Sequence, residues 1–184
     1  MKLQFDANQE YQLDAIKAAV DIFKGQPIDS GGFTSEVTES AHGYLYNSCF
    51  VVGNKLELTE KTIEENLRHI QTLNDIPHGF GHEPFGHFPW GHAECDGLHF
   101  SLEMETGTGK TYVYLRTIHE LNKHYGFKKF IIVVPSLAIK EGVLKNLQIT
   151  EEHFELLYEK PQVNFYLYDP KKRGLARNFA TTNK

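Results

Sequence analysis

The stretch that decides the fold is Met104-Glu105-Thr106-Gly107-Thr108-Gly109-Lys110-Thr111. It follows an apolar, strand-like segment at residues 98–102 and precedes a helix-like segment at residues 112–124. A phosphate-binding loop has this context of strand, glycine-rich turn and helix. The glycines let backbone N–H groups curl around an anion, and the helix N-terminus adds free donors and a partial positive charge. The stretch therefore predicts a site for a nucleoside triphosphate.

The side chains of this loop fit the same chemistry. Lys110 is expected to reach the β- and γ-phosphates, and the Thr111 hydroxyl to be a ligand of the Mg²⁺ ion that accompanies them, so these two residues carry the catalytic prediction. The residues expected to bind the cofactor here are Thr106, Gly107, Thr108, Gly109, Lys110 and Thr111. Met104 stands where the general pattern has glycine, which leaves a chance turn as the alternative. A merely structural turn, however, has no need of both Lys110 and Thr111.

Composition bounds the class of protein. The chain has 184 residues, 40% of them hydrophobic and 23% charged, as in a globular domain with a proper core. No apolar run approaches the roughly 20 residues that span a bilayer, and the N-terminus lacks signal-peptide character, so we expect a cytoplasmic protein without a membrane partner. A net charge of -5 argues against a strongly basic surface that coats nucleic acid, although Lys171, Lys172, Arg173 and Arg177 form a local basic cluster.

The pattern of apolar residues predicts an α/β protein. Expected helices cover residues 9–24, 59–75, 112–125, 137–147 and 150–157. The second starts at Thr59 and is ended by Ile76-Pro77, and the last two have Ser136 and Thr150 as N-caps. In the first helix the expected apolar face holds Tyr11, Ala15, Ile16, Ala19, Val20 and Phe23. Expected strands cover residues 98–104, 130–134 and 163–168, and residues 44–52 are read as a strand or hairpin. Strands that alternate with helices predict a parallel sheet with flanking helices and the phosphate loop at its C-terminal edge.

Residues 78–97 differ from the rest in composition. Within them, Gly-His-x-Pro-aromatic repeats at a spacing of five residues, which excludes a regular helix or a central strand. We therefore expect an irregular His/Gly/Pro-rich insert. Its imidazoles could bind Zn²⁺, Ni²⁺ or Cu²⁺, but so flexible a segment is a poor preorganised cage, and a metal-free loop stays open as the alternative.

Several strings together resemble one family. They are Tyr11-Gln12, the stretch from Phe100 through the glycine-rich loop to Ile118, the run Phe130-Ile131-Ile132-Val133-Val134-Pro135-Ser136, and Ile139-Lys140-Glu141-Gly142-Val143. They resemble the Res subunit of type III restriction enzymes, a branch of the superfamily 2 helicases, most closely over residues 98–160. The resemblance implies a P-loop NTPase with a RecA-like first helicase lobe. It also implies ATP and Mg²⁺ as cofactors, double-stranded DNA as substrate and a DNA methyltransferase (Mod) subunit as partner.

The resemblance also implies roles for residues outside the loop. Gln12 matches the glutamine that hydrogen-bonds the adenine edge in such helicases, and a solvent-facing helix residue is the alternative. Pro135 and Ser136 match a motif that contacts a phosphate of the nucleic acid. Ser136 is also a good N-cap, and the two roles are compatible because a capped helix N-terminus attracts phosphate.

The sequence departs from the family in one respect. Hydrolysis needs an acidic pair after another core strand, and Asp169-Pro170 is the nearest candidate, without the second carboxylate. We therefore expect the N-terminal portion of a Res subunit, with an incomplete first lobe, that binds nucleotide but does not translocate or cut DNA by itself. The remaining helicase lobe and the nuclease domain would belong to the parent chain.

The expected division is 1–25 as an adenine-motif helix, 26–97 as an insert with one helix, and 98–184 as the first part of the ATP-binding lobe. Two other functions stay open. One is a non-catalytic nucleotide-binding module, and the other is a metal-binding module that uses the His-rich insert.

Overall fold

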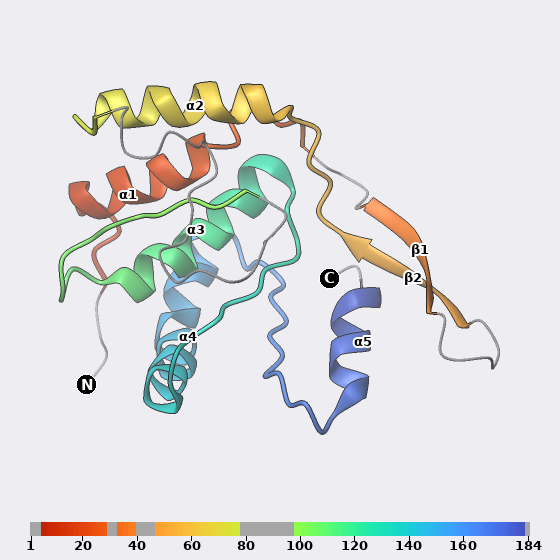
Figure 1. Cartoon of the computed structure of the whole chain (residues 1–184). Coiled ribbons are helices and arrows are strands. Elements are labelled where there is room, and N and C mark those ends of the chain that lie inside the picture. Colours follow the sequence, from red (N-terminus) through yellow and green to blue (C-terminus); the bar gives the residue numbers. More distant parts are fainter. Residues whose placement is uncertain (1–4, 29–32, 40–46, 78–97, 183–184) are drawn as a thin grey trace. The chain divides into compact units, whose positions relative to one another are not determined.

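The computed structural model describes residues 5–28, 33–39, 47–77 and 98–182 (Figure 1). Its elements in chain order are α1 (Glu10–Asp21), β1 (Phe33–Glu39), β2 (Asn47–Gly53), α2 (Glu60–Leu73), α3 (Lys110–Tyr125), α4 (Leu137–Leu157) and α5 (Arg173–Thr181). They fall into two compact units. The first unit holds residues 6–26 and 58–117, and the second holds the described parts of residues 1–5, 27–57 and 118–184.

The first unit is built on the pair of helices α1 and α2, which lie against each other (Figure 1). Its buried centre is a cluster of Ile22, Ile63 and Ile70, against which Leu98 and Phe100 also pack. A polar link adds to this packing. Asn66 of α2 donates hydrogen bonds to the carbonyl oxygens of Ile22 (3.0 Å) and Lys24 (2.9 Å) at the end of α1. The extended segment that leads into the glycine-rich loop is thus fixed on the two helices.

Local sequence signals place the ends of these helices well. The second helix starts at Thr59 as predicted, and the Thr59 side chain caps it by accepting a hydrogen bond from the Thr62 amide. Gly25, which has a φ of 95°, ends the α1 region. The predicted apolar face of α1 is right for Ile16 and Val20, which are buried, but wrong for Tyr11, which is half exposed. The residue buried beside them is the polar Gln12.

The second unit contains an antiparallel hairpin, β1–β2, whose register runs from Phe33 opposite Gly53 to Glu39 opposite Asn47. The predicted strand or hairpin at residues 44–52 is therefore confirmed over most of its length. Helix α5 lies against β2. The basic cluster in this region was recognised from the sequence, but the helix was not.

Asn54 and Lys129 join the hairpin side of this unit to α5. The Asn54 side chain bonds the backbone of Lys128 and Lys129, with all three donor–acceptor distances at 2.8–3.0 Å. The Lys129 ammonium in turn donates to the carbonyl oxygens of Phe179 and Thr182 at the C-terminal end of α5. Carbonyl groups at a helix C-terminus lack intrahelical partners, so a lysine there stabilises the helix end.

Helix α4 is longer than the sequence predicts. Ser136 caps its start as expected, accepting from the Ile139 amide at 3.3 Å. The predicted break at Thr150 is wrong, because the helix continues through this residue to Leu157. The Thr150 side chain is fully buried, and its hydroxyl donates to the Asn146 carbonyl one turn earlier at 2.7 Å. A threonine that bonds backward along a helix looks in sequence like one that caps a new helix.

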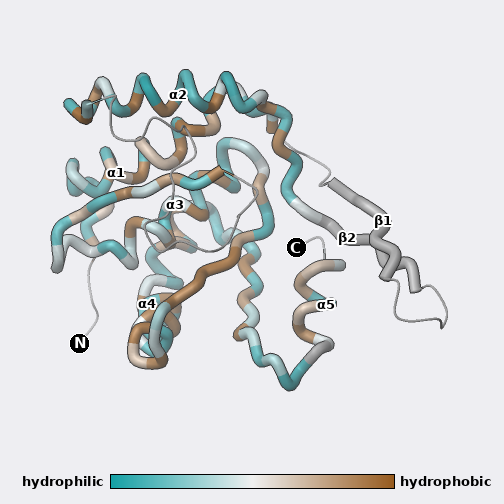
Figure 2. The backbone as a smooth tube through the Cα atoms, in the orientation of Figure 1, coloured by the Kyte–Doolittle hydropathy of each residue, from teal (hydrophilic) through white to brown (hydrophobic). Residues whose placement is uncertain are grey.

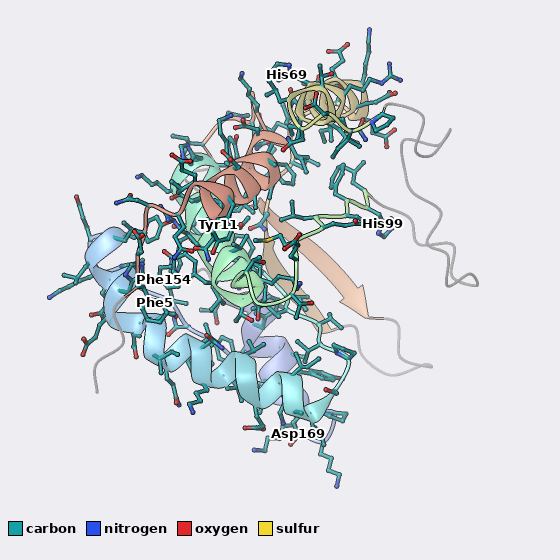
Figure 3. All side chains as sticks on the ribbon, turned by 90° about the vertical axis from the view of Figure 1, so that its left-hand side faces the viewer. Phe5, Tyr11, His69, His99, Phe154 and Asp169 are labelled. Carbon is teal, nitrogen blue, oxygen red and sulfur yellow. The ribbon has the colours of Figure 1, made fainter. Side chains whose placement is uncertain are left out.

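An aromatic cluster packs the second half of α3 against α4. The His119 ring stacks on Tyr158, with ring centroids 4.9 Å apart and an interplanar angle of 15°, and lies 4.7 Å from the Phe154 ring. The Tyr158 hydroxyl donates to the Glu120 carboxylate at 2.6 Å. Phe5 lies beside the same end of α4 (Figure 3), with its ring 5.4 Å from that of His153. These contacts fix α4 on α3 within the second unit.

The predicted parallel sheet is not confirmed. Residues 98–104, 130–134 and 163–168 form no strand among the described residues, where the sheet structure consists of β1 and β2. Figure 2 shows the segment before α4 as a strongly apolar stretch. Its Ile131 and Val133 are nonetheless 78% and 87% exposed, and Tyr168 is 74% exposed. The sequence states which side chains favour burial, but a strand also needs a neighbour that completes its backbone hydrogen bonds.

Candidate functional site

The two glycines of the loop have a backbone conformation that glycine adopts more readily than other residues. Gly107 and Gly109 have φ values of 87° and 85°, a region that side chains with a Cβ rarely adopt. The Gly109 carbonyl accepts the first intrahelical bond of α3, from the Val113 amide at 3.1 Å. The loop therefore leads directly into the N-terminus of a 16-residue helix, where unpaired N–H groups and the helix dipole favour a bound phosphate.

Lys110 turns back onto this loop. Its ammonium group donates to the carbonyl oxygens of Met104 (2.7 Å) and Glu105 (2.8 Å), and the side chain is exposed. The Thr108 hydroxyl donates to the same Glu105 carbonyl at 2.7 Å, which closes the loop on itself. In this conformation the Lys110 ammonium donates its hydrogen bonds to carbonyl oxygens of the loop. Phosphate oxygens would be stronger acceptors for the same group.

Gln12 of α1 meets the loop from the other side. Its side-chain amide, which is 7% exposed, donates to the Thr108 carbonyl at 2.8 Å. A Cβ placed on Gly109 would lie 2.7 Å from the Gln12 Nε2 atom. Gln12 is therefore neither solvent-facing nor remote from the site. The structure brings it together with the loop residues, as its predicted role in nucleotide binding requires.

A second contact fixes α1 beside α3. The Arg116 guanidinium, which is buried, donates to the Ala7 carbonyl at 2.6 Å, just before α1. Tyr112 lies on the same helix and is also buried, with its hydroxyl 3.5 Å from the Arg116 Nη1 atom. Arg116 was not recognised from the sequence, where an arginine inside an amphipathic helix looks like a surface residue.

Tyr114 completes the surroundings of Thr111. The Tyr114 hydroxyl oxygen is buried and has no partner of hydrogen-bond geometry. Burial raises the pKa of this hydroxyl, and the nearby Thr111 side chain acts in the opposite direction by favouring the phenolate. Thr111 itself is half buried. The tyrosine therefore keeps its proton at neutral pH beside the predicted Mg²⁺ ligand.

The other predicted site residues, Pro135 and Ser136, and the acidic candidate Asp169 lie in the second unit. Pro135 and Ser136 are exposed at the N-terminus of α4, where Ser136 acts as the N-cap. Asp169 accepts a hydrogen bond from the Lys171 amide at 2.9 Å, in the turn before α5 (Figure 3). This local bond gives Asp169 a structural role in the turn.

The metal-binding alternative depends on residues 78–97, which lie outside the described residues. Elsewhere, over the described ranges, no group of three or more His, Cys, Asp or Glu residues is placed to hold a metal ion. Among the helices that the structure describes, none is long and apolar enough to cross a membrane.

Comparison with known proteins gives a consistent result. The sequence matches the family model for "Type III restriction enzyme, res subunit" over residues 9–174. It is 36% identical over 126 residues to the type III restriction-modification enzyme EcoPI Res subunit of Escherichia phage P1, covering 67% of this chain and 12% of that protein. It is also 36% identical over 122 residues to the EcoP15I Res subunit of Escherichia coli, covering 65% of this chain and 12% of that protein. A third relative, the StyLTI Res subunit of Salmonella typhimurium, is 44% identical over 70 residues.

Proposed function

The chain belongs to the family of type III restriction enzyme Res subunits, and we propose that it forms the part that binds ATP and Mg²⁺. The family match confirms the resemblance seen in the sequence. It also implies a P-loop helicase fold. The observation that carries the proposal is the loop geometry. Two glycines with positive φ lead into α3, and Lys110 lies folded on the loop carbonyls.

The residues of the loop fit a nucleotide with its metal ion. A Cβ on Gly107 would meet nothing within 4 Å, so the backbone there is open to a close approach by phosphate oxygens. Lys110 would exchange its carbonyl partners for β- and γ-phosphate oxygens, and Thr111 would offer its hydroxyl oxygen to Mg²⁺. Thr106 to Gly109 would supply backbone N–H groups. The ion would neutralise charge on the phosphates, and the chain's own residues would hold and orient the nucleotide.

Gln12 is proposed to read the adenine edge. Its Nε2 atom already donates to the Thr108 carbonyl, and its side-chain oxygen has no such bond to the loop. An amide with one group on the loop and the other free can accept from the adenine amino group while it keeps the loop in place. This link between base and phosphate loop is the basis for the preference for ATP.

The chain spans about 12% of the length of the curated relatives EcoPI and EcoP15I that it matches. We propose that residues 1–25 act as the adenine-motif helix, 26–97 as an insert, and 98–184 as the first part of a RecA-like lobe. Its parallel sheet would use residues 98–104, 130–134 and 163–168 as strands. The exposure of Ile131 and Val133 supports this assignment. Apolar side chains left exposed are expected where a strand has no neighbour to pair with. Slow amide exchange at residues 131–134 would show that the pairing exists, and fast exchange would exclude it for this chain.

The parent protein is proposed to couple ATP hydrolysis to movement along double-stranded DNA and to its cleavage, together with a Mod methyltransferase subunit. Pro135 and Ser136 at the N-terminus of α4 would contact a DNA phosphate, where the helix dipole favours an anion. The sequence has no Asp-Glu pair after an apolar run. We therefore expect this chain to bind nucleotide without turnover, and phosphate release clearly above background would contradict that expectation.

A titration with a fluorescent ATP analogue in the presence of Mg²⁺ tests nucleotide binding directly. Lys110→Ala removes the ammonium that contacts phosphate and is expected to weaken binding about tenfold or more. Lys61→Ala on α2 is the matched control, because Lys61 is 82% exposed and far from any loop residue in sequence. Absence of saturable binding by the folded wild-type chain, or equal affinity of the two variants, would refute the proposal.

A further inference from the structure

The buried hydroxyl of Tyr114 lies on the helix that follows the loop, and the proposed function leaves it unexplained. Its oxygen is inaccessible to solvent and has no hydrogen-bond partner in the part of the chain that the structure describes. A buried hydroxyl left unsatisfied destabilises a protein by about 1–3 kcal/mol, compared with an apolar group of the same shape. A phenylalanine at this position would avoid that cost. We therefore look for a functional reason for the hydroxyl group.

The position of Tyr114 relates it to one particular loop residue. Residues three apart on a helix lie on the same face, and Thr111 is three residues before Tyr114 on α3. Burial raises the pKa of Tyr114 and the Thr111 side chain lowers it, which agrees with this proximity. The two side chains therefore share one face of α3 near its first turn, and the Tyr114 oxygen has no hydrogen-bond partner among the described residues.

We propose that Tyr114 is a positioning residue that aims the Thr111 hydroxyl at the Mg²⁺ ion of the bound nucleotide, an inference that rests on the proposed function. A threonine oxygen has one proton and two lone pairs. If the proton is donated to the Tyr114 oxygen inside the protein, a lone pair is directed outward for the metal ion. With Mg²⁺ held on its oxygen, the Thr111 hydroxyl would be a stronger hydrogen-bond donor to Tyr114. The orphaned hydroxyl then acquires its partner in the loaded state.

The experiment measures nucleotide affinity twice for each variant of the full 184-residue chain, with Mg²⁺ and with EDTA. The readout is the dissociation constant in EDTA divided by the dissociation constant with Mg²⁺. This ratio isolates the contribution of the metal ion to binding. Tyr114→Phe is expected to reduce this ratio about three- to tenfold and to leave the affinity in EDTA within about twofold. Tyr112→Phe is the matched control, since it removes a hydroxyl from the same helix on the Arg116 side and should leave the ratio unchanged.

Two further measurements separate positioning from a structural role. Because the Tyr114 hydroxyl is unsatisfied without ligand, Tyr114→Phe should leave the melting temperature of the free chain unchanged or higher. The additional rise in melting temperature on addition of Mg²⁺ and nucleotide should be smaller than in the wild type. In a Thr111→Ala background, Tyr114→Phe should have no further effect on the Mg²⁺ ratio, because the group that it positions is gone.

The outcomes distinguish this inference from the proposed function. If the wild-type chain binds nucleotide with a clear Mg²⁺ dependence and Tyr114→Phe leaves the ratio unchanged, the inference is overturned and nucleotide binding stands. An equal loss in Tyr112→Phe, or an undiminished effect of Tyr114→Phe in the Thr111→Ala background, would overturn it as well. If the wild-type chain does not bind nucleotide with Mg²⁺, both fail together.

Discussion

Replacing Gly109 with alanine tests how closely the loop depends on Gln12. The φ of 85° at Gly109 is unfavourable for a residue with a Cβ, and occupying the left-handed region costs about 1–2 kcal/mol. The new Cβ would also lie 2.7 Å from the Gln12 Nε2 atom. The glutamine must move, and its 2.8 Å bond to the Thr108 carbonyl is lost inside a buried site. The loss of this hydrogen bond adds about 1–2 kcal/mol, the lower part of the usual range for a buried amide, because the end of the glutamine side chain can turn away.

Gly107 provides the matched control for this substitution. Its φ of 87° is nearly the same, but a Cβ there would meet nothing within 4 Å. Gly107→Ala should therefore cost only the backbone contribution of about 1–2 kcal/mol. For a chain of this size, the extra loss of about 1–2 kcal/mol in Gly109→Ala lowers the melting temperature by a further 2–8 °C or so. Thermal unfolding, followed by circular dichroism, measures the difference between the two variants.

A double-mutant cycle with Gln12→Ala completes the test. Without the glutamine side chain, Gly109→Ala should cost no more than Gly107→Ala, which gives a coupling free energy of about 1–2 kcal/mol between positions 12 and 109. Equal destabilisation by the two alanines in the wild-type background, with no coupling to Gln12→Ala, would refute the contact between α1 and the loop.

Three other substitutions check the second unit by thermal or urea unfolding. Ser136→Ala removes the N-cap of α4 and should cost about 1 kcal/mol, while Ser136→Asp should retain most of the stability; equal losses would contradict the capping role. Lys129→Met removes the ammonium from the end of α5 and should cost about 0.5–1 kcal/mol, whereas Lys145→Met at an exposed position of α4 should be nearly neutral. Burial lowers the pKa of His119, with Glu120 acting weakly in the opposite direction, so folding favours the neutral ring. Its contribution to stability should be present above pH 6.5 or so and be lost as the pH falls below that value, and His119→Phe should reduce this pH dependence. An unchanged pH profile in that variant would argue against the packing of His119.

Local chemistry explains which features could be predicted from the sequence. The positive φ of Gly107 and Gly109 follows from the glycine-rich turn, and the start of α2 at Thr59 and of α4 at Ser136 from side-chain caps. Each of these features depends on residues within a few positions of one another. The sequence therefore contains all the information that they require.

The features that the sequence could not supply depend on residues far apart in the chain. The sequence predicts Thr150 as the N-cap of a new helix. The structure shows instead that its hydroxyl donates to the Asn146 carbonyl within one continuous helix α4. Helix α5 went unpredicted, and its end is fixed by Lys129, 50 residues before the Phe179 carbonyl that it contacts.

By itself, the sequence determined that a glycine-rich loop stands at the start of α3 and which family the chain resembles, because both depend on short strings of residues. Only the tertiary structure decided that Gln12 reaches the loop from 96 positions away and that the Tyr114 hydroxyl is buried without a hydrogen-bond partner among the described residues. It also left residues 130–134 unpaired, where the sequence predicts a strand. The physical reason is the same in each case. Side-chain chemistry fixes what a residue can bind, but a hydrogen bond forms only where the packing of distant segments brings donor and acceptor together.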